Sequence, residues 1–402
     1  MNWSDFSKRG IGGGWTVNFQ QQLQRFPAIS DLQERARSRI PHVSWEYLSG
    51  GTGEDEGRRR NREGLARITL RPRFLKGPLE PDIRTTLFGQ QYEAPFGIAP
   101  VGLTGLVWPR AEQILAQTAR KYGFPYTLST VATQTPETIG PLAGEMGWFQ
   151  LYPPRRAEIR ADLLQRVKDA GFRTLVLTVD IPAPSRRERM SRAGLEMPPR
   201  LTPRFIAQAM VCPEWSYETL REGLPSLKGL HKYAGTEQMA GLSNFVRQNI
   251  GGTLSWDYMA EVRELWDGPL VIKGIVHPAD AVEAIRLGAD GIQVSNHGGR
   301  QFDGNPAAID TLPPIVEAVK GRAAVIFDSG VRSGLDIIRA LALGADFVML
   351  GRAFMFGVAA FGRTGGDHAA EILLADLKTN MHQLGVDSIA AVKALEAGRD
   401  GA

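Results

Sequence analysis

A histidine and an arginine stand three residues apart in a glycine-rich stretch, Asn296-His297-Gly298-Gly299-Arg300, that follows a short apolar run. The imidazole of His297 can exchange a proton near neutral pH, and the flat guanidinium of Arg300 matches a carboxylate. The glycines allow the backbone to approach a flat ligand. This set indicates proton abstraction from a small carboxylic acid, although an isolated pair would more often be a loop histidine and a surface arginine.

Short apolar segments recur from Pro95 onward, and a helical stretch follows each one. Eight parallel strands that alternate with helices close into a (β/α)8 TIM barrel, so this α/β fold is predicted. The predicted strands are residues 96–100, 126–130, 148–152, 174–179, 270–275, 291–295, 324–327 and 347–350. A doubly wound open sheet is the alternative, but no Gly-x-Gly-x-x-Gly sequence follows the first strand. A hairpin with its turn at Gly89 is predicted to close one end of the barrel.

Polar residues stand where the later strands end, and the catalytic residues of (β/α)8 barrels gather at such carboxyl ends. They are Thr178 and Asp180 at the end of strand four, Lys273 on strand five, His297 and Arg300 after strand six, Asp328, Gly330 and Arg332 after strand seven, and Gly351 and Arg352 after strand eight. The loops after strands seven and eight are the usual phosphate position of this fold, since glycine N–H groups and arginines bind the anion there. The alternative is a pair of arginines that cap surface helices.

The segment Ser295-Asn296-His297-Gly298-Gly299-Arg300-Gln301 resembles the signature of the FMN-dependent L-2-hydroxy acid dehydrogenases and oxidases. That family includes glycolate oxidase, mandelate dehydrogenase and the flavin-linked lactate dehydrogenases, and the resemblance extends from Asp31 to Leu384. It implies an FMN enzyme that oxidises an L-2-hydroxy acid to the 2-oxo acid. An FMN barrel of another class, such as an isomerase or an amine dehydrogenase, would share only the phosphate site, and a catalytically silent flavin-binding protein would not need the catalytic set.

The resemblance implies an FMN site across the barrel mouth. The phosphate would bind Gly330, Arg332, Gly351 and Arg352, the ribityl chain Asp328, and the ring the backbone of Pro100, Val101 and Gly102 with the side chains of Ser129, Gln150, Thr178, Ser295 and Lys273. Lys273 has apolar flanks, and a lysine is rarely buried without a partner. Beside the ring, its ammonium would stabilise the negative charge of the reduced cofactor. The hydroxyl and amide groups also fit a role as ordinary buried polar groups.

The resemblance also implies a substrate site on the other side of the ring. His297 would remove the hydroxyl proton or the α-proton, and Asp180 would orient the imidazole and stabilise its protonated form. The carboxylate and hydroxyl of the substrate would meet Arg300, Arg187, Tyr152 and Tyr47. Whether the electrons leave as a hydride or through a carbanion is open at this stage.

Three features favour a bulky, mandelate-like substrate over glycolate. Val131 stands where glycolate oxidase carries a tryptophan, and residues 100–109 look similar to mandelate dehydrogenase. Residues 188–252 resemble the longer form of this insertion in mandelate and bacterial lactate dehydrogenases. The alternatives are a lactate-type dehydrogenase and an oxidase that uses oxygen and releases hydrogen peroxide. The acceptor is expected to be a quinone, a carrier protein or oxygen. Gly102 lies where the family backbone approaches the flavin and lacks the methyl group of an alanine; this likeness to mandelate dehydrogenase implies a dehydrogenase and favours a quinone.

The composition limits which partners the protein can bind and where in the cell it is expected. Lys and Arg number 47 against 43 Asp and Glu, and no dense basic tract indicates nucleic acid. Cys212 is the only cysteine, which excludes an internal disulfide, a thiolate metal site and an iron–sulfur cluster, and no metal is predicted. No apolar run is long enough for a membrane span and no signal core precedes the domain, so a cytoplasmic location is expected. The resemblance implies a homo-oligomer, as a tetramer or in another number.

One FMN-binding domain is predicted for residues 29–384, with a helical segment before the barrel, a mobile arm at 1–28 and a tail at 385–402. Residues 188–252 are an insertion between strands four and five. It is either a lid over the barrel mouth or a segment that contacts the inner membrane peripherally. Its apolar residues are Phe205, Ile206, Met210, Val211 and Trp215. Such a mix beside arginines can lie at an anionic membrane surface.

Overall fold

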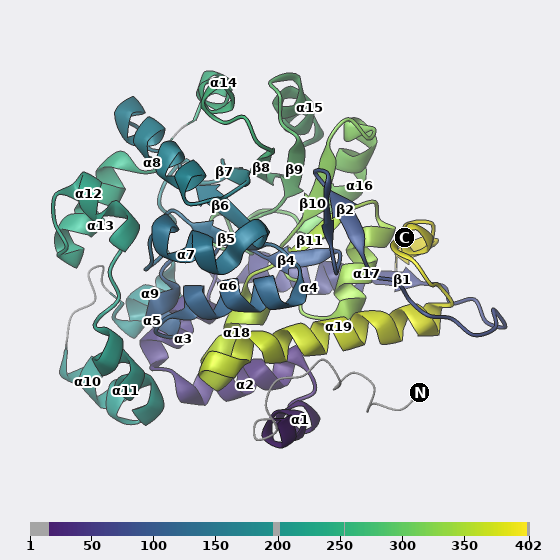
Figure 1. The fold of residues 1–402 in the computed structure, drawn as a ribbon, viewed down its shortest axis with the longest axis horizontal. Helices are drawn as coiled ribbons and strands as arrows, with labels where there is room; N and C mark the ends of the chain where they lie inside the picture. The colour runs from purple at the N-terminus through teal and green to yellow at the C-terminus, as the bar shows by residue number, and fades with distance from the viewer. Residues whose placement is uncertain (1–15, 196–201, 253, 400–402) are drawn as a thin grey trace.

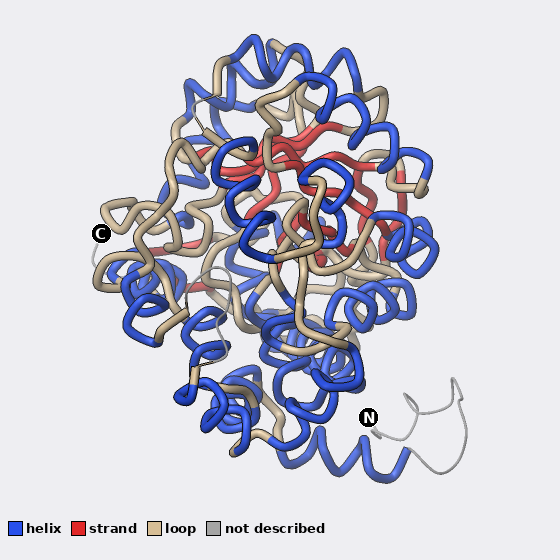
Figure 2. Tube along the Cα trace, turned by 90° about the vertical axis from the view of Figure 1, so that its left-hand side faces the viewer, coloured by secondary structure: helices blue, strands red, loops and turns tan. Residues whose placement is uncertain are grey.

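The structure, a computed structural model, describes residues 16–195, 202–252 and 254–399 (Figure 1). Its centre is a closed barrel of parallel strands in the order β10-β11-β4-β5-β6-β7-β8-β9, which helices enclose (Figure 2). The strands are β4 (Phe96–Ile98), β5 (Tyr126–Ser129), β6 (Gly147–Leu151), β7 (Thr174–Thr178), β8 (Leu270–Ile275), β9 (Gly291–Val294), β10 (Ala324–Phe327) and β11 (Phe347–Leu350). The predicted (β/α)8 barrel is confirmed, and each strand ends within two residues of its predicted bounds.

Helices connect successive strands on the outside of the barrel. They are α5 (Thr104–Val107), α6 (Ala111–Tyr122), α7 (Pro136–Ala143), α8 (Ala157–Asp169), α14 (Trp256–Leu265), α15 (Pro278–Arg286), α16 (Ala308–Val319), α17 (Gly334–Ala342) and α18 (Arg352–Phe361). Short 3-10 turns lie at Gly144–Met146, Lys228–Leu230 and Gly362–Thr364. Gly288 and Gly344 follow α15 and α17 with φ of 90° and 99°, a backbone conformation that favours glycine and stops each helix before the next strand.

A hairpin closes the amino end of the barrel, as predicted. Its strands β2 (Thr85–Leu87) and β3 (Gln90–Tyr92) pair antiparallel. Leu87 and Tyr92 belong to one buried cluster with Trp148 and with side chains of the barrel interior. The Trp148 indole donates to the Tyr92 hydroxyl at 3.2 Å. This plug leaves the carboxyl ends of the strands as the open mouth.

Both ends of the chain are more ordered than the sequence indicates. Helix α1 (Thr16–Arg25) precedes α2 (Ile29–Arg39), α3 (His42–Ser49) and α4 (Glu56–Ala66). Residues 16–25 of the predicted arm form helix α1, and the Phe19 ring lies edge-on to His368, with 6.0 Å between ring centroids. Residues 1–15 of the predicted arm lie outside the described residues.

The predicted tail folds back onto the domain after α19 (Gly365–Leu384). It forms α20 (Ile389–Lys393) and strand β12 (Ala397–Arg399), which pairs antiparallel with β1 (Ile68–Leu70). Val392 is fully buried and Ile389 is 7% exposed. Burial of apolar side chains of this kind stabilises the packed state, so residues 385–399 are part of the domain and not a free tail.

The insertion between β7 and β8 forms helices that stand at the left of Figure 1. They are α9 (Glu188–Ala193), α10 (Pro203–Met210), α11 (Pro213–Glu222), α12 (His231–Ala234) and α13 (Met239–Asn249). Trp215 is only 2% exposed and packs against the Phe205 ring, so its assignment to an apolar surface is wrong. Met210 and Val211 are exposed at 71% and 74%.

Candidate active site

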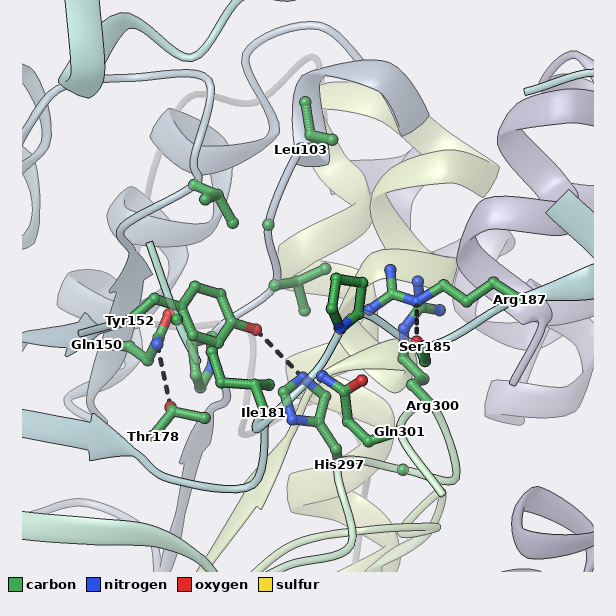
Figure 3. A pocket seen from close by; sticks show the side chains of 18 of the residues that line it. Leu103, Gln150, Tyr152, Thr178, Ile181, Ser185, Arg187, His297, Arg300 and Gln301 are labelled. Carbon is green, nitrogen blue, oxygen red and sulfur yellow. Dashed lines mark hydrogen bonds between the residues drawn. The ribbon is translucent and has the colours of Figure 1, made fainter. Parts of the chain in front are cut away.

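A cavity of about 630 Å³ opens at the carboxyl ends of the barrel strands (Figure 3). The predicted site residues that line it are Tyr47, Pro100, Val101, Gly102, Val131, Gln150, Tyr152, Thr178, Arg187, Lys273, His297, Arg300, Asp328, Gly330, Arg332, Gly351 and Arg352. Three others stand behind this lining, each bonded to one of its members: Ser129 to Gln150, Asp180 to His297 and Ser295 to Lys273. The fold thus brings together residues that are far apart in the chain.

His297 projects from the loop after β9 with a positive φ of 57°. This conformation is costly for a residue with a side chain, and Gly298 and Gly299 continue it at 63° and 75°. The His297 Nδ1 lies 2.9 Å from Asp180 Oδ1, and a carboxylate can only accept, so Nδ1 carries the proton. The Nε2 atom is then the basic nitrogen, and the Tyr152 hydroxyl donates to it at 3.2 Å.

Burial keeps His297 neutral, and the neighbouring charges keep Asp180 ionised. Burial, helped by the nearby Lys273 ammonium, lowers the pKa of His297 below its ordinary value of 6.5, although Asp180 opposes the shift. Burial alone would raise the pKa of Asp180, but His297 and Lys273 outweigh it and the pKa is lowered. A neutral imidazole backed by a carboxylate is ready to accept a proton at neutral pH.

Lys273 lies on β8 and is only 4% exposed. Its ammonium donates to the Ser295 hydroxyl at 3.1 Å and stands 3.7 Å from Asp328 Oδ2. Burial would lower the pKa of Lys273, but Asp328 and Asp180 outweigh it and the pKa is raised. The site therefore keeps a positive charge at its floor, with Asp328 also held by Gln293 and the Ser295 hydroxyl.

A chain of hydrogen bonds crosses three neighbouring strands beside Lys273. The Ser129 hydroxyl donates to Gln150 Oε1 at 2.8 Å, and Gln150 Nε2 donates to Thr178 Oγ1 at 3.0 Å (Figure 3 shows the second bond). All three side chains are buried. The Gln150 and Thr178 groups line the cavity, so they present polar atoms to a bound ring.

Three half-buried arginines line the cavity, and their guanidinium groups donate to backbone carbonyl oxygens. Arg352 donates to Leu48, Gly50 and Gly298, Arg300 to Tyr47 and Gly50, and Arg332 to Val331. Burial and the charge of Arg187 lower the pKa of Arg300 to about 10, and burial with Arg62 lowers that of Arg332 to about 9. Burial also lowers the pKa of Arg352. Partly buried cations of this kind favour an anionic ligand.

The residues present fit FMN. Gly330, with φ of 96°, and Gly351 supply backbone at the end of the cavity where Arg332 and Arg352 stand, as a phosphate requires. At the other end, Gln150, Thr178 and the charged Lys273 suit a polar ring edge. The Gly102 backbone packs closely against Val131, because a Cβ at Gly102 would lie 2.6 Å from Val131 Cγ2.

Tyr47 and Arg187 also line the cavity. The Tyr47 hydroxyl donates to the Gly102 carbonyl at 2.6 Å, and the Arg300 guanidinium lies 5.0 Å from the centre of the Tyr47 ring. Arg187 Nε donates to Ser185 Oγ at 3.0 Å (Figure 3). Arg187 and Arg300 therefore both present cationic groups on the side of the cavity where Tyr152 and His297 stand.

Sequence reasoning missed Ser329 as a support of this site. Its hydroxyl accepts N–H groups from Asn296 at 3.2 Å and from Gly298 at 3.1 Å, and it donates to Asp328 at 2.7 Å. Ser329 has a φ of 88°, which is unusual for a residue with a side chain. The only signal in the sequence was its position between Asp328 and Gly330.

A closed parallel barrel with a basic histidine, a buried lysine and an anion cradle at one mouth defines the class of flavin-dependent barrel oxidoreductases. Residues 36–397 match the FMN-dependent dehydrogenase family, so this chain belongs to that family. The protein is an FMN-dependent hydroxy acid oxidoreductase, and its cofactor is FMN. Its substrate is a small hydroxy acid.

Relatives of known name agree with this assignment. The chain is 41% identical over 366 residues to an L-lactate dehydrogenase of Xanthobacter autotrophicus, covering 90% of this chain and 94% of the relative. It is 40% identical over 371 residues to an L-lactate dehydrogenase of Pseudomonas aeruginosa, covering 91% and 97%.

Solved structures give the same fold. A monotopic membrane protein, (S)-mandelate dehydrogenase, matches with a TM-score of 0.87 and 30% identity over 92% of this chain and 98% of that one. A mandelate oxidase matches with a TM-score of 0.79 and 32% identity, again over 92% and 98%. The predicted family is confirmed, and the relatives include both lactate and mandelate enzymes.

Proposed function

We propose that this protein oxidises an L-2-hydroxy acid to the 2-oxo acid with His297 as the base. The observation that carries the proposal is the Asp180–His297–Tyr152 alignment, with bonds of 2.9 and 3.2 Å, at a cavity that also holds Arg187 and Arg300. Bound FMN supplies the acceptor for the two electrons that leave the substrate. His297 Nε2 takes the substrate proton, and Asp180 stabilises the resulting imidazolium.

The remaining side chains bind and orient the substrate. Arg300 and Arg187 bind its carboxylate, since a planar guanidinium donates to both carboxylate oxygens. Tyr152 and Tyr47 present hydroxyl groups to it. The cofactor is held at Lys273, at the polar groups of β5 to β7 and at the arginines after β10 and β11. Heat-denatured protein is expected to release non-covalent FMN, and protein that neither releases nor binds flavin would contradict this account.

The substrate is proposed to be a bulky or aromatic 2-hydroxy acid of the mandelate kind. Val131, Leu103 and Ile181 line the cavity and provide apolar surface there. A lactate-type enzyme is the second candidate, favoured by the relatives at about 40% identity that are named L-lactate dehydrogenases. The second-order rate constants for anaerobic reduction of the flavin by (S)-mandelate, L-lactate and glycolate distinguish the two candidate substrates. A larger second-order rate constant for L-lactate than for (S)-mandelate would overturn the first choice.

The electron acceptor is proposed to be a quinone. A relative in this fold is a monotopic membrane protein, and Gly102 leaves the backbone beside the cofactor without a methyl group. Flavin reduced by its substrate is expected to reoxidise faster with a soluble quinone analogue than with aerated buffer. Reoxidation by oxygen at the rate of turnover would assign an oxidase instead.

Residues 188–252 are proposed to contact the cytoplasmic face of the inner membrane. No helix of the described chain has the length and apolar character needed to cross a bilayer. The inserted helices α10 and α11 and the turn after them nevertheless expose large apolar side chains: Ile206, Met210, Val211, Tyr217, Leu220 and Leu224. Amphipathic helices of this kind lie in the plane of a membrane interface.

The protein is also proposed to form a homo-oligomer, as a tetramer or in another number. Phe74 and Leu75 support it, because they expose 71% and 103% of their reference surface at the tip of one loop, where a second copy could cover them. Light scattering in dilute detergent is the test, and a mass of one 44.1 kDa chain at micromolar concentration would remove this proposal.

A further inference from the structure

Arg189 lies on α9, at the start of the insertion, and its side chain reaches across to α3. Its Nε and Nη2 donate to the two carboxylate oxygens of Glu46 at 2.6 and 3.0 Å, and its Nη1 donates to Asp55 Oδ2 at 2.6 Å. The Glu46 and Asp55 side chains are only 12% and 14% exposed. A paired fork of this geometry is stronger and more directional than a single ion pair.

The two carboxylates stand on either side of one turn, residues 49–53, which we call the Gly50 turn. Arg189 Nη2 also donates to the Ser49 hydroxyl at 3.1 Å. Asp55 Oδ1 accepts the Gly51 N–H at 2.6 Å. The neighbouring Glu188 accepts the Gly53 N–H at 2.8 Å. Residues of helix α9 therefore bond the Gly50 turn at both of its ends, at Ser49 and at Gly53.

The Gly50 turn also accepts hydrogen bonds from two cavity arginines. The Gly50 carbonyl accepts Arg300 Nη1 at 3.0 Å and Arg352 Nη2 at 2.7 Å. Arg300 also donates to the Tyr47 carbonyl at 2.7 Å, and Tyr47 follows Glu46 directly on α3. A shift of the Gly50 turn would move both the acceptors of Arg300 and the ring on which its guanidinium lies.

We propose that Arg189 is a positioning residue for the substrate carboxylate. It fixes the Gly50 turn and Tyr47, and through them the direction in which Arg300 presents its guanidinium. Helix α9 also carries Arg187 as its N-cap residue, so both carboxylate-binding arginines take their position from one helix. The inference rests on the proposed function, in which Arg300 and Arg187 bind the carboxylate.

The test is Arg189→Lys in the full-length holoenzyme. Lysine keeps the charge but cannot reproduce the planar fork that bonds both oxygens of Glu46 together with Asp55. The substrate dissociation constant, taken from the concentration dependence of anaerobic flavin reduction, is expected to rise about ten-fold, because a small displacement of a binding group is costly. The limiting reduction rate should change by less than about three-fold, since His297 is untouched. FMN content should stay at the wild-type level.

A matched control is Arg192→Lys on the same helix. Arg192 is 64% exposed and stands 3.7 Å from Glu54, which is itself 80% exposed, so the dissociation constant should not change. Arg300→Lys is measured in parallel. If Arg300→Lys leaves the dissociation constant unchanged, the proposed binding of the substrate carboxylate by Arg300 is wrong. If Arg300→Lys raises the dissociation constant and Arg189→Lys does not, only the proposed role of Arg189 is wrong.

A purely structural role has a different signature. It predicts loss of FMN and a lower melting temperature for Arg189→Lys, with the dissociation constant of the remaining holoenzyme unchanged, and that result would overturn the inference. Should the variant not fold, Ser49→Ala removes one of the bonds and leaves the Glu46 fork. A smaller rise in the same constant, with the limiting rate retained, supports the inference, and an unchanged constant contradicts it.

Discussion

At the residue scale, the reactivity of His297 comes from its two partners and its backbone. The sequence predicted His297 and Asp180 by residue type and position, because strand ends of a parallel barrel converge, and the family resemblance implied Tyr152. It could not predict that Arg300 and Arg352 share the Gly50 carbonyl, because that contact joins segments about 250 and 300 residues apart through the backbone. Side-chain patterns carry no record of a carbonyl acceptor.

In the proposed mechanism, the charge of His297 sets the pH dependence of the reaction. Because burial lowers its pKa below 6.5, the neutral base persists into mildly acidic solution. The acid limb of kcat/KM, which reports the free enzyme, is therefore expected below pH 6.5, with activity lost as pH falls through the lowered pKa. A limb at or above pH 7 would contradict this assignment. The profile is measured by steady-state assay with a soluble acceptor.

Asp180→Asn provides the matching test of the Asp180–His297 pair. The carboxylate raises the pKa of His297, so its removal should move the acid limb to still lower pH. The rate should fall by about 10²–10⁴, because the imidazolium loses its counter-charge and its fixed tautomer. A limb that moves to higher pH, or a wild-type rate, would show that Asp180 does not act through His297.

At the element scale, the turn after β10 holds the loop that carries His297. Ser329 adopts a φ of 88°, and its hydroxyl accepts two backbone N–H groups of that loop. Ser329→Ala keeps the strained backbone and removes these bonds, so it should lower the free energy of unfolding by about 2–3 kcal/mol. Ser329→Gly relieves the backbone and should cost about 1 kcal/mol less. Denaturant melts of the holoenzymes measure both, and a glycine variant less stable than the alanine variant would refute the strain.

The elements differ in how well the sequence predicts them. Buried parallel strands are continuous apolar runs, and for that reason β8, β10 and β11 match their predicted bounds. The inserted helices alternate short apolar and polar stretches, so their number and packing did not follow from the pattern. Trp215 illustrates the difficulty, since an isolated tryptophan fits a buried contact with Phe205 as well as it fits a surface.

At the scale of the whole molecule, the exposed apolar side chains of α10 and α11 lie far from α15, which stands at the top of Figure 1. Vesicles that contain anionic lipid are expected to carry the wild-type protein upward in a flotation gradient. The double variant Met210→Glu, Leu220→Glu should stay at the bottom, because it places charge in the apolar layer. Val282→Glu on α15, at a side chain 38% exposed, is the control and should float. If all three proteins behave equally in the flotation gradient, these apolar side chains do not bind the membrane, and a lid remains as the function of the insertion.

The central claim is that His297 takes the substrate proton beside bound FMN. It is tested most directly by mixing substrate with wild-type and His297→Ala holoenzymes without oxygen and following the flavin absorbance. The wild-type protein should lose its absorbance and form one 2-oxo acid per flavin. The alanine variant should keep its FMN and react slower by about 10²–10⁴ or more, the usual cost of losing a general base. Reduction of the His297→Ala flavin at a rate close to that of the wild type would contradict the account.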